Sequence, residues 1–162
     1  MKILLKTLAL SAVLLASAAA SAAVTINFVK PETYPDMPFS PVERDATLKE
    51  IGDYFTKLGQ NLPEGTDLRI EVLDLDLAGN LEPSRRGNSD LRIMRGGADW
   101  PRMKLHYAIE SGGKVIKDGD AQLQDMDYQA HASRLTDGDP LRYEKRMIDD
   151  WFYSTIAPRK KR

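Results

Sequence analysis

The sequence predicts an α+β fold, in which a mixed or antiparallel sheet of about five strands carries two helices on one face. Three observations predict it. Runs that alternate between apolar and polar residues recur along the chain, as in half-buried strands. Two segments carry apolar residues at helical spacing, one after the first strand and one near the end of the chain. The later strands are joined by short links, which suit antiparallel pairing. The predicted order is β-α-β-β-β-β-α.

The first strand and the first helix are predicted from residues 24–62. Residues 24–29 (VTINFV) alternate and are rich in β-branched side chains, which indicates a strand. A proline-rich, irregular connection follows. Ser40 and Pro41 then begin a helix, with Glu43 completing a capping box, and the helix ends near Gly59. Its apolar stripe has spacings of three and four residues and consists of Leu48, Ile51, Phe55, Leu58 and Leu62.

The segment LRIEVLDLDL is the strongest predicted strand. Leu68, Ile70 and Val72 share one face, but the apolar positions then change parity to Leu73, Leu75 and Leu77. Because side chains alternate with a two-residue period, this change requires either two buried faces or an extra residue, which returns the later apolar side chains to the first face. We therefore expect a β-bulge near Val72–Leu73.

The second half of the chain is predicted to add three strands and a helix. A polar loop over residues 80–88 leads to a short strand at 91–94, which is a candidate hairpin partner of the strand at 103–109. Glycines 112 and 113 make a hairpin turn to a return strand at 115–123. Asp139 and Pro140 cap and begin the last helix, which Pro158 ends. Its apolar side consists of Leu141, Met147, Ile148, Trp151, Phe152 and Ile156.

The N-terminal 23 residues read as a secretory signal peptide. Lys2 and Lys6 precede a short apolar run, and Ala20-Ser21-Ala22 fits the small-residue cleavage pattern, with cuts after Ala22 or Ala23 both compatible. The expected organisation is a signal peptide over residues 1–23, one α+β domain over 24–157 and a basic tail over 158–162. The expected location is the periplasm or the medium.

The amino-acid composition argues against several classes of protein and of functional site. The chain has 23 Lys and Arg against 24 Asp and Glu, and loss of Lys2 and Lys6 leaves 21 against 24, a net charge of −3. This balance argues against a general nucleic-acid binder, which needs a basic surface. The chain has no cysteine, which excludes a thiol nucleophile and a cysteine-ligated zinc. No segment after the signal peptide is long and apolar enough to span a membrane.

Two aspartates on the strongest strand are candidate binding residues. Asp74 and Asp76 stand two residues apart, so their side chains leave the same face, about 6.6 Å apart along the strand. A metal site or a general acid/base pair uses such geometry, but the pattern favours the simpler explanation, the solvent face of an amphipathic strand. No third metal ligand follows from the spacing, and no metal or cofactor is predicted.

The stretch RGGADWPR (95–102) supplies the other candidates: Arg95, Asp99, Trp100 and Arg102. Its glycines permit a sharp turn, and the residue before Pro101 is biased towards an extended conformation. The charged side chains Arg95, Asp99 and Arg102 have two explanations. They pair with one another on the surface, or the arginines join Arg85 and Arg86 in an anion-binding site, since guanidinium groups bind carboxylates and phosphates well.

Three segments resemble one family: IEVLDLDLAG (70–79), RGGADWPR (95–102) and GDPLRYEKRMIDDW (138–151). They are similar to blocks of the domain-of-unknown-function 3016 family of small exported proteins from Gram-negative bacteria. The resemblance implies a one-domain periplasmic protein and no known activity, cofactor or catalytic residue.

The function expected from the sequence is that of an exported, non-enzymatic binding or interaction module. Its expected partner is a periplasmic protein or a small anionic ligand, and no catalytic residue is assigned. The alternative is a periplasmic hydrolase that uses carboxylates, with Asp74 and Asp76 beside Arg95 or Arg102.

Overall fold

A computed structural model describes residues 23–82, 91–130 and 138–158 of the chain. Residues 1–22 of the predicted signal peptide lie outside the described residues, as do Arg85, Arg86 and the basic tail after Pro158.

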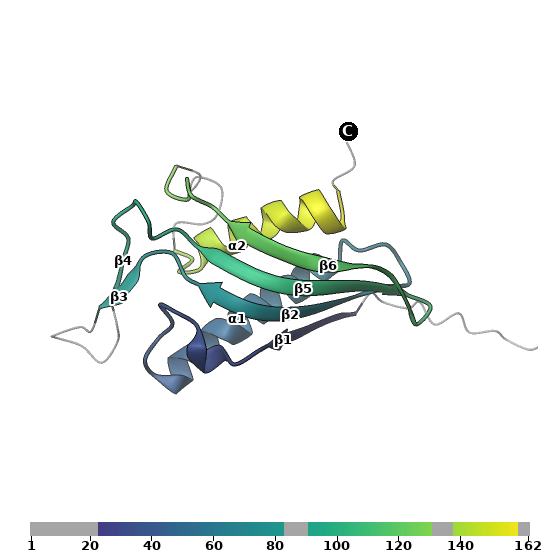
Figure 1. Cartoon of the computed structure of the whole chain (residues 1–162), viewed down its shortest axis with the longest axis horizontal. Coiled ribbons are helices and arrows are strands. Elements are labelled where there is room, and N and C mark those ends of the chain that lie inside the picture. Colours follow the sequence, from purple (N-terminus) through teal and green to yellow (C-terminus); the bar gives the residue numbers. More distant parts are fainter. Residues whose placement is uncertain (1–22, 83–90, 131–137, 159–162) are drawn as a thin grey trace, which may run out of the picture.

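A mixed four-stranded sheet forms the centre of the molecule (Figure 1). Its order is β1-β2-β5-β6, and the strands are β1 (Val24–Phe28), β2 (Thr66–Asp76), β5 (Arg102–Ser111) and β6 (Lys114–Gln124). β1 runs parallel to β2, whereas the β2–β5 and β5–β6 pairs are antiparallel. A parallel pair needs a crossover connection, and the helix between β1 and β2 provides it.

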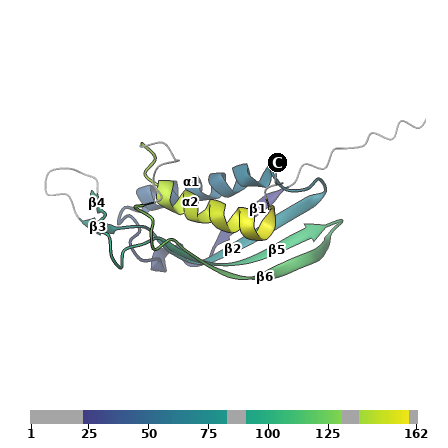
Figure 2. The same ribbon diagram turned by 90° about the horizontal axis from the view of Figure 1, so that it is seen from above.

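Both helices lie on one face of this sheet. α1 (Pro41–Gly59) and α2 (Arg142–Trp151) run side by side across it, as Figure 2 shows, and α2 continues into a π-helical turn, η3 (Phe152–Ile156). The predicted fold class and element order are confirmed, with one short strand, β3, in addition. The core between the layers includes Ile51 and Phe55 of α1, Ile148 of α2, and Ile70 and Leu105 of the sheet.

The predicted β-bulge in β2 is confirmed. Val72 pairs with Leu105, but Asp74 pairs with Lys104, so Leu73 is the extra residue. Leu75 is completely buried, as the change of parity predicted. Leu73 itself is 47% exposed, because the bulged residue turns its side chain out of the alternation, and its predicted place on the buried face is wrong.

The segment at 91–94 does not pair with β5, and its predicted hairpin is wrong. β4 (Leu91–Ile93) instead pairs with β3 (Asn80–Glu82), which was expected to be loop, in a separate two-stranded ribbon. The physical reason is that β5 already has β2 and β6 as neighbours and offers no free edge. The chain reaches the ribbon through Gly79, whose φ is +79°. A Cβ there would lie 2.6 Å from the Ile93 carbonyl oxygen.

Two helix starts differ in detail from the prediction. Ser40 is the N-cap of α1 and Pro41 its first residue, but the Ser40 side chain makes no capping hydrogen bond, so the capping box is absent at this residue. α2 begins at Arg142, later than predicted. Asp139 precedes it in a turn, where its Oδ1 accepts the Leu141 backbone N–H at 2.8 Å.

Candidate binding site

Two rows of polar side chains lie next to each other where β2, β5 and β6 approach the same end of the sheet. The strand register places Asp76 opposite Arg102 and Arg102 opposite Gln124. The adjacent row is Asp74, Lys104 and Gln122. Since side chains two residues apart share a face, both rows lie on the face opposite the buried Met103 and Leu123. These six residues and Pro35 border a depression of about 320 Å³.

The charged groups of the rows are paired but accessible. Arg102 donates through Nε to Asp76 Oδ2 at 2.9 Å and also through Nη2, and Lys104 Nζ lies 3.6 Å from Asp74 Oδ2. The side chains of Arg102 and Lys104 remain 51% and 57% exposed, and that of Asp74 41%. Asp76, in contrast, is buried. A ligand can therefore meet two cations and one carboxylate without any rearrangement of the backbone.

The proline-rich segment before α1 places another carboxylate beside the rows. Tyr34 and Met37 anchor this segment in the core, and the Tyr34 hydroxyl donates to the Val72 carbonyl oxygen at the bulge, at 2.7 Å. Burial raises the pKa of the Tyr34 hydroxyl to about 12. Between the two anchors, Asp36 adopts a left-handed conformation with φ +50°. The sequence prediction missed this carboxylate because nothing in the spacing of an irregular segment shows where it packs.

Asp36 and Asp76 interact directly. Burial is the main cause that raises the pKa of Asp36, and the negative charge of Asp76 and a hydrogen bond with it raise that pKa further. A hydrogen bond from the Leu81 backbone and the charge of Arg102 act in the opposite direction but do not cancel the rise. In the folded protein Asp36 therefore holds its proton to a higher pH than in the unfolded chain.

Replacing Asp36 with asparagine is expected to stabilise the protein at pH 7. A folded-state pKa above the unfolded value means that stability falls as pH rises from about 3.8 through the raised pKa. Asparagine removes this loss, can donate to Asp76, and tolerates positive φ. We expect the melting temperature to rise by roughly 1–4 °C at pH 7. The gain should disappear as the pH approaches 4, which thermal unfolding across this range can measure. An equal gain at pH 4 and pH 7 would contradict the assignment.

Arg95, Asp99 and Trp100 lie outside the depression. The Asp99 carboxylate accepts the Arg95 backbone N–H at 2.8 Å and the Tyr128 hydroxyl at 3.0 Å, which closes the loop over two glycines with positive φ. Burial alone would raise the pKa of Asp99, but these hydrogen bonds outweigh it and lower that pKa. The Arg95 side chain pairs with Glu82 at 2.6 Å, on the surface.

Trp100 connects this loop to the depression. It packs against a small cluster of Ala78, Tyr128 and Tyr143, and the Arg102 guanidinium carbon lies 5.7 Å from the centre of its ring. Of the two alternatives for these charges, surface pairing of the Arg95, Asp99 and Arg102 side chains with one another is wrong. Arg102 pairs with Asp76, which lies opposite it in the strand register, and Arg95 pairs with Glu82 of the ribbon. Of the six candidate residues, Asp74, Asp76 and Arg102 share the depression.

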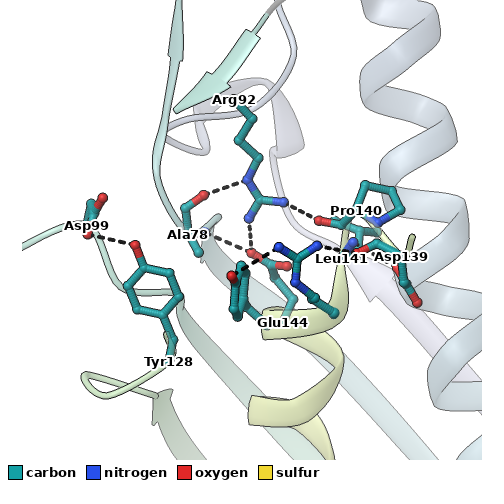
Figure 3. A network of polar contacts seen from close by, with 10 residues as sticks. Ala78, Arg92, Asp99, Tyr128, Asp139, Pro140, Leu141 and Glu144 are labelled. Atoms are coloured by element: carbon teal, nitrogen blue, oxygen red, sulfur yellow. Dashed lines mark hydrogen bonds and ion pairs between the residues drawn. The ribbon is translucent and has the colours of Figure 1, made fainter. Parts of the chain in front are cut away.

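A second polar network, which the sequence prediction missed, joins the ribbon to α2 (Figure 3). Arg92 of β4 donates to the carboxylate of Glu144, which also accepts the Ala78 backbone N–H at 2.8 Å. The same guanidinium donates to the carbonyl oxygens of Ala78 and Pro140, at 2.5 and 2.6 Å. Glu144 is completely buried, so its carboxylate is closed to a ligand, and its contacts hold the ribbon against α2.

Other candidate chemistry is limited in the part of the chain that the structure describes. Over residues 23–82, 91–130 and 138–158, no three His, Asp or Glu side chains are grouped so as to hold a metal ion. His106 Nδ1 lies 2.8 Å from Asp120 Oδ1, a two-residue contact on the exposed face of the sheet. Among the described helices, none is long and apolar enough to cross a membrane.

Comparison with known proteins gives one family. The family model described as "Protein of unknown function (DUF3016)" matches residues 22–154, which cover nearly all of the described structure. The search of curated proteins gives no match. The family match agrees with the resemblance of the three sequence blocks.

Proposed function

Because the chain belongs to the DUF3016 family, whose description assigns no function, we propose its role from geometry: it is an exported, non-enzymatic binding module for a small dipolar ligand. Such a ligand carries both a carboxylate and an ammonium group, as an amino acid or a short peptide does. Export is supported by the basic and then apolar N-terminal residues with the Ala20-Ser21-Ala22 pattern.

The single observation that carries the ligand assignment is the pair of rows around the depression. Arg102 and Lys104 offer accessible cations to a carboxylate, and Asp74 offers an accessible carboxylate to an ammonium group. Because the rows contain two acids and two bases, a purely anionic ligand would meet repulsion from Asp74 and Asp76, whereas a dipolar ligand meets both signs. The amides of Gln122 and Gln124 add donors and acceptors at the border.

The existing ion pairs do not prevent such binding. Exposed pairs contribute only about 0–1 kcal/mol each, so exchanging Lys104–Asp74 for contacts with a ligand costs little. Hydrogen bonds to charged groups contribute roughly 1.5–3 kcal/mol each. A few of them in an open depression correspond to a dissociation constant on the order of 0.1–1 mM. Weak, reversible capture is the expected behaviour.

Alanine at Arg102 or Lys104 is expected to weaken capture of an unblocked dipeptide such as Ala-Ala at least tenfold. Chemical shift changes in ¹⁵N-labelled protein measure the affinity, and the affected amides should lie along β2, β5 and β6. Blocking either the amine or the carboxylate of the dipeptide should weaken binding by a similar factor. Lys49→Ala is the matched control, because Lys49 also forms an exposed ion pair, with Asp53 on α1. Equal binding by all three variants, or no preference for the unblocked dipeptide, would refute the assignment.

The contact between Asp36 and Asp76 favours one alternative, a carboxylate-dependent hydrolase. Burial and the neighbouring charge of Asp76 raise the pKa of Asp36. A carboxyl group that keeps its proton in this way can act as a general acid beside a second carboxyl group. The same titration distinguishes the two functions, because a hydrolase would convert the dipeptide to free alanine. Conversion that stops in Asp76→Asn would replace the binding proposal with the hydrolase.

A further inference from the structure

Ala23, the residue just before β1, forms hydrogen bonds to β2 through both its carbonyl oxygen and its nitrogen. The Ala23 carbonyl oxygen accepts the Leu68 N–H at 2.8 Å, which extends the parallel β1–β2 ladder by one residue. The Ala23 nitrogen donates to Asp67 Oδ1 at 2.9 Å. An aspartate thus faces the nitrogen that would become the chain terminus if the leader were cut immediately before Ala23.

We propose that the mature protein begins at Ala23 and that its new α-ammonium group forms an ion pair with Asp67. The step is hydrolysis of the Ala22–Ala23 peptide bond by a leader peptidase. Water supplies the oxygen of the Ala22 carboxylate that leaves with the leader, and Ala23 keeps the amine, which is protonated at neutral pH. This inference rests on the export part of the proposed function and is independent of the ligand.

The sequence alone leaves two cuts open, since small residues precede both Ala23 and Val24 at the positions that a leader peptidase reads. The contacts of Ala23 favour one of these two cuts. A cut after Ala23 removes the carbonyl oxygen that accepts the Leu68 N–H. A cut after Ala22 keeps this bond and replaces the neutral amide donor to the Asp67 carboxylate with an ammonium group, so that the hydrogen bond becomes an ion pair.

The surroundings of Val24 also argue against a charge at that residue. Val24 is partly buried and packs against the core. It sits so close to α1 that a Cβ on Gly59 would lie 2.1 Å from Val24 Cγ2. An ammonium group at Val24 would stand beside this apolar contact, where burial of a charge is unfavourable. At Ala23, which is exposed, the ammonium group remains in water and next to Asp67.

Expression of the full chain in a Gram-negative host, followed by intact mass and N-terminal sequencing of the exported protein, tests the cut. We expect the chain to begin at Ala23. Export with a start at Val24 would overturn this inference alone. A chain that stays whole in the cytoplasm would overturn the export proposal as well.

The ion pair is tested by comparing the thermal unfolding of chains that begin at Ala23 and at Val24, each with and without Asp67→Asn. The Ala23 chain is expected to melt roughly 2–5 °C higher, and Asp67→Asn should reduce that difference. Asp53→Asn on α1 is the control and should leave the difference unchanged. Identical melting temperatures for the two chains, or a difference unaffected by Asp67→Asn, would overturn the pairing.

Discussion

Replacing Arg92 with alanine is expected to reduce the free energy of unfolding by about 3–5 kcal/mol, since it leaves a buried carboxylate without its cation. The carboxylate is that of Glu144, whose side chain is 0% exposed, and the Arg92 side chain is itself only 15% exposed. Within the described residues, Glu144 Oε2 has no hydrogen-bond partner, and Oε1 accepts from Arg92 and the Ala78 backbone N–H. Arg92 is the cation that pairs with this carboxylate. Because both side chains are buried, little water can enter to solvate the Glu144 carboxylate once the Arg92 guanidinium is removed.

The loss extends beyond one ion pair because Arg92 connects three segments. Its guanidinium also donates to the carbonyl oxygens of Ala78, before the ribbon, and of Pro140, before α2 (Figure 3). Without Arg92, these acceptors and the Glu144 carboxylate lose donors together. The β3–β4 ribbon, which is not part of the main sheet, then keeps the hydrogen bond of its Leu81 backbone to Asp36 and, next to it, the small cluster around Tyr128 and Trp100.

Urea unfolding followed by circular dichroism measures this effect. The control is Arg69→Ala, which removes an arginine that is 61% exposed and pairs with Glu110 at 3.1 Å; it should change stability by less than about 1 kcal/mol. A double variant, Arg92→Met with Glu144→Leu, should recover much of the loss, because apolar residues of similar volume often replace a buried ion pair without penalty. Equal destabilisation by Arg92→Ala and Arg69→Ala would show that the Glu144 pair is not buried.

Features that depend on local periodicity could be predicted from the sequence. The stripe containing Ile51 and Phe55 fixed the buried side of α1, and the change of parity after Val72 located the bulge. Both follow from side-chain direction along one element. The partner of β4 could not be predicted in this way, since it depends on which sheet edges remain free after β2, β5 and β6 have paired.

The candidate site was predictable only in part for the same reason. Asp74 and Asp76 follow from spacing on one strand, but their partners Lys104 and Arg102 follow from the register between strands, which alternation alone does not define. Asp36 reaches the site because Tyr34 and Met37 bury an irregular segment. Such long-range packing leaves no periodic signal in the sequence.

Replacing Phe55 with alanine is expected to reduce the free energy of unfolding by about 3–5 kcal/mol, because it removes a large ring from a closed core. Phe55 is 0% exposed and is the α1 contribution to an aromatic stack. Its ring meets that of Trp151 of α2 edge-on, with centroids 6.2 Å apart, and Trp151 meets Tyr107 of β5 in the same manner at 5.6 Å. The stack therefore links both helices to the sheet.

Chemical denaturation of Phe55→Ala and of Val42→Ala provides the measurement and its control. Val42 lies on the same helix but is 77% exposed, so its truncation should change stability by less than about 0.5 kcal/mol. The surrounding rings cannot collapse fully into the space left by Phe55, because Trp151 is held on its other side by Tyr107. A cost below about 1 kcal/mol for Phe55→Ala would mean that α1 and α2 do not share one closed core over the sheet.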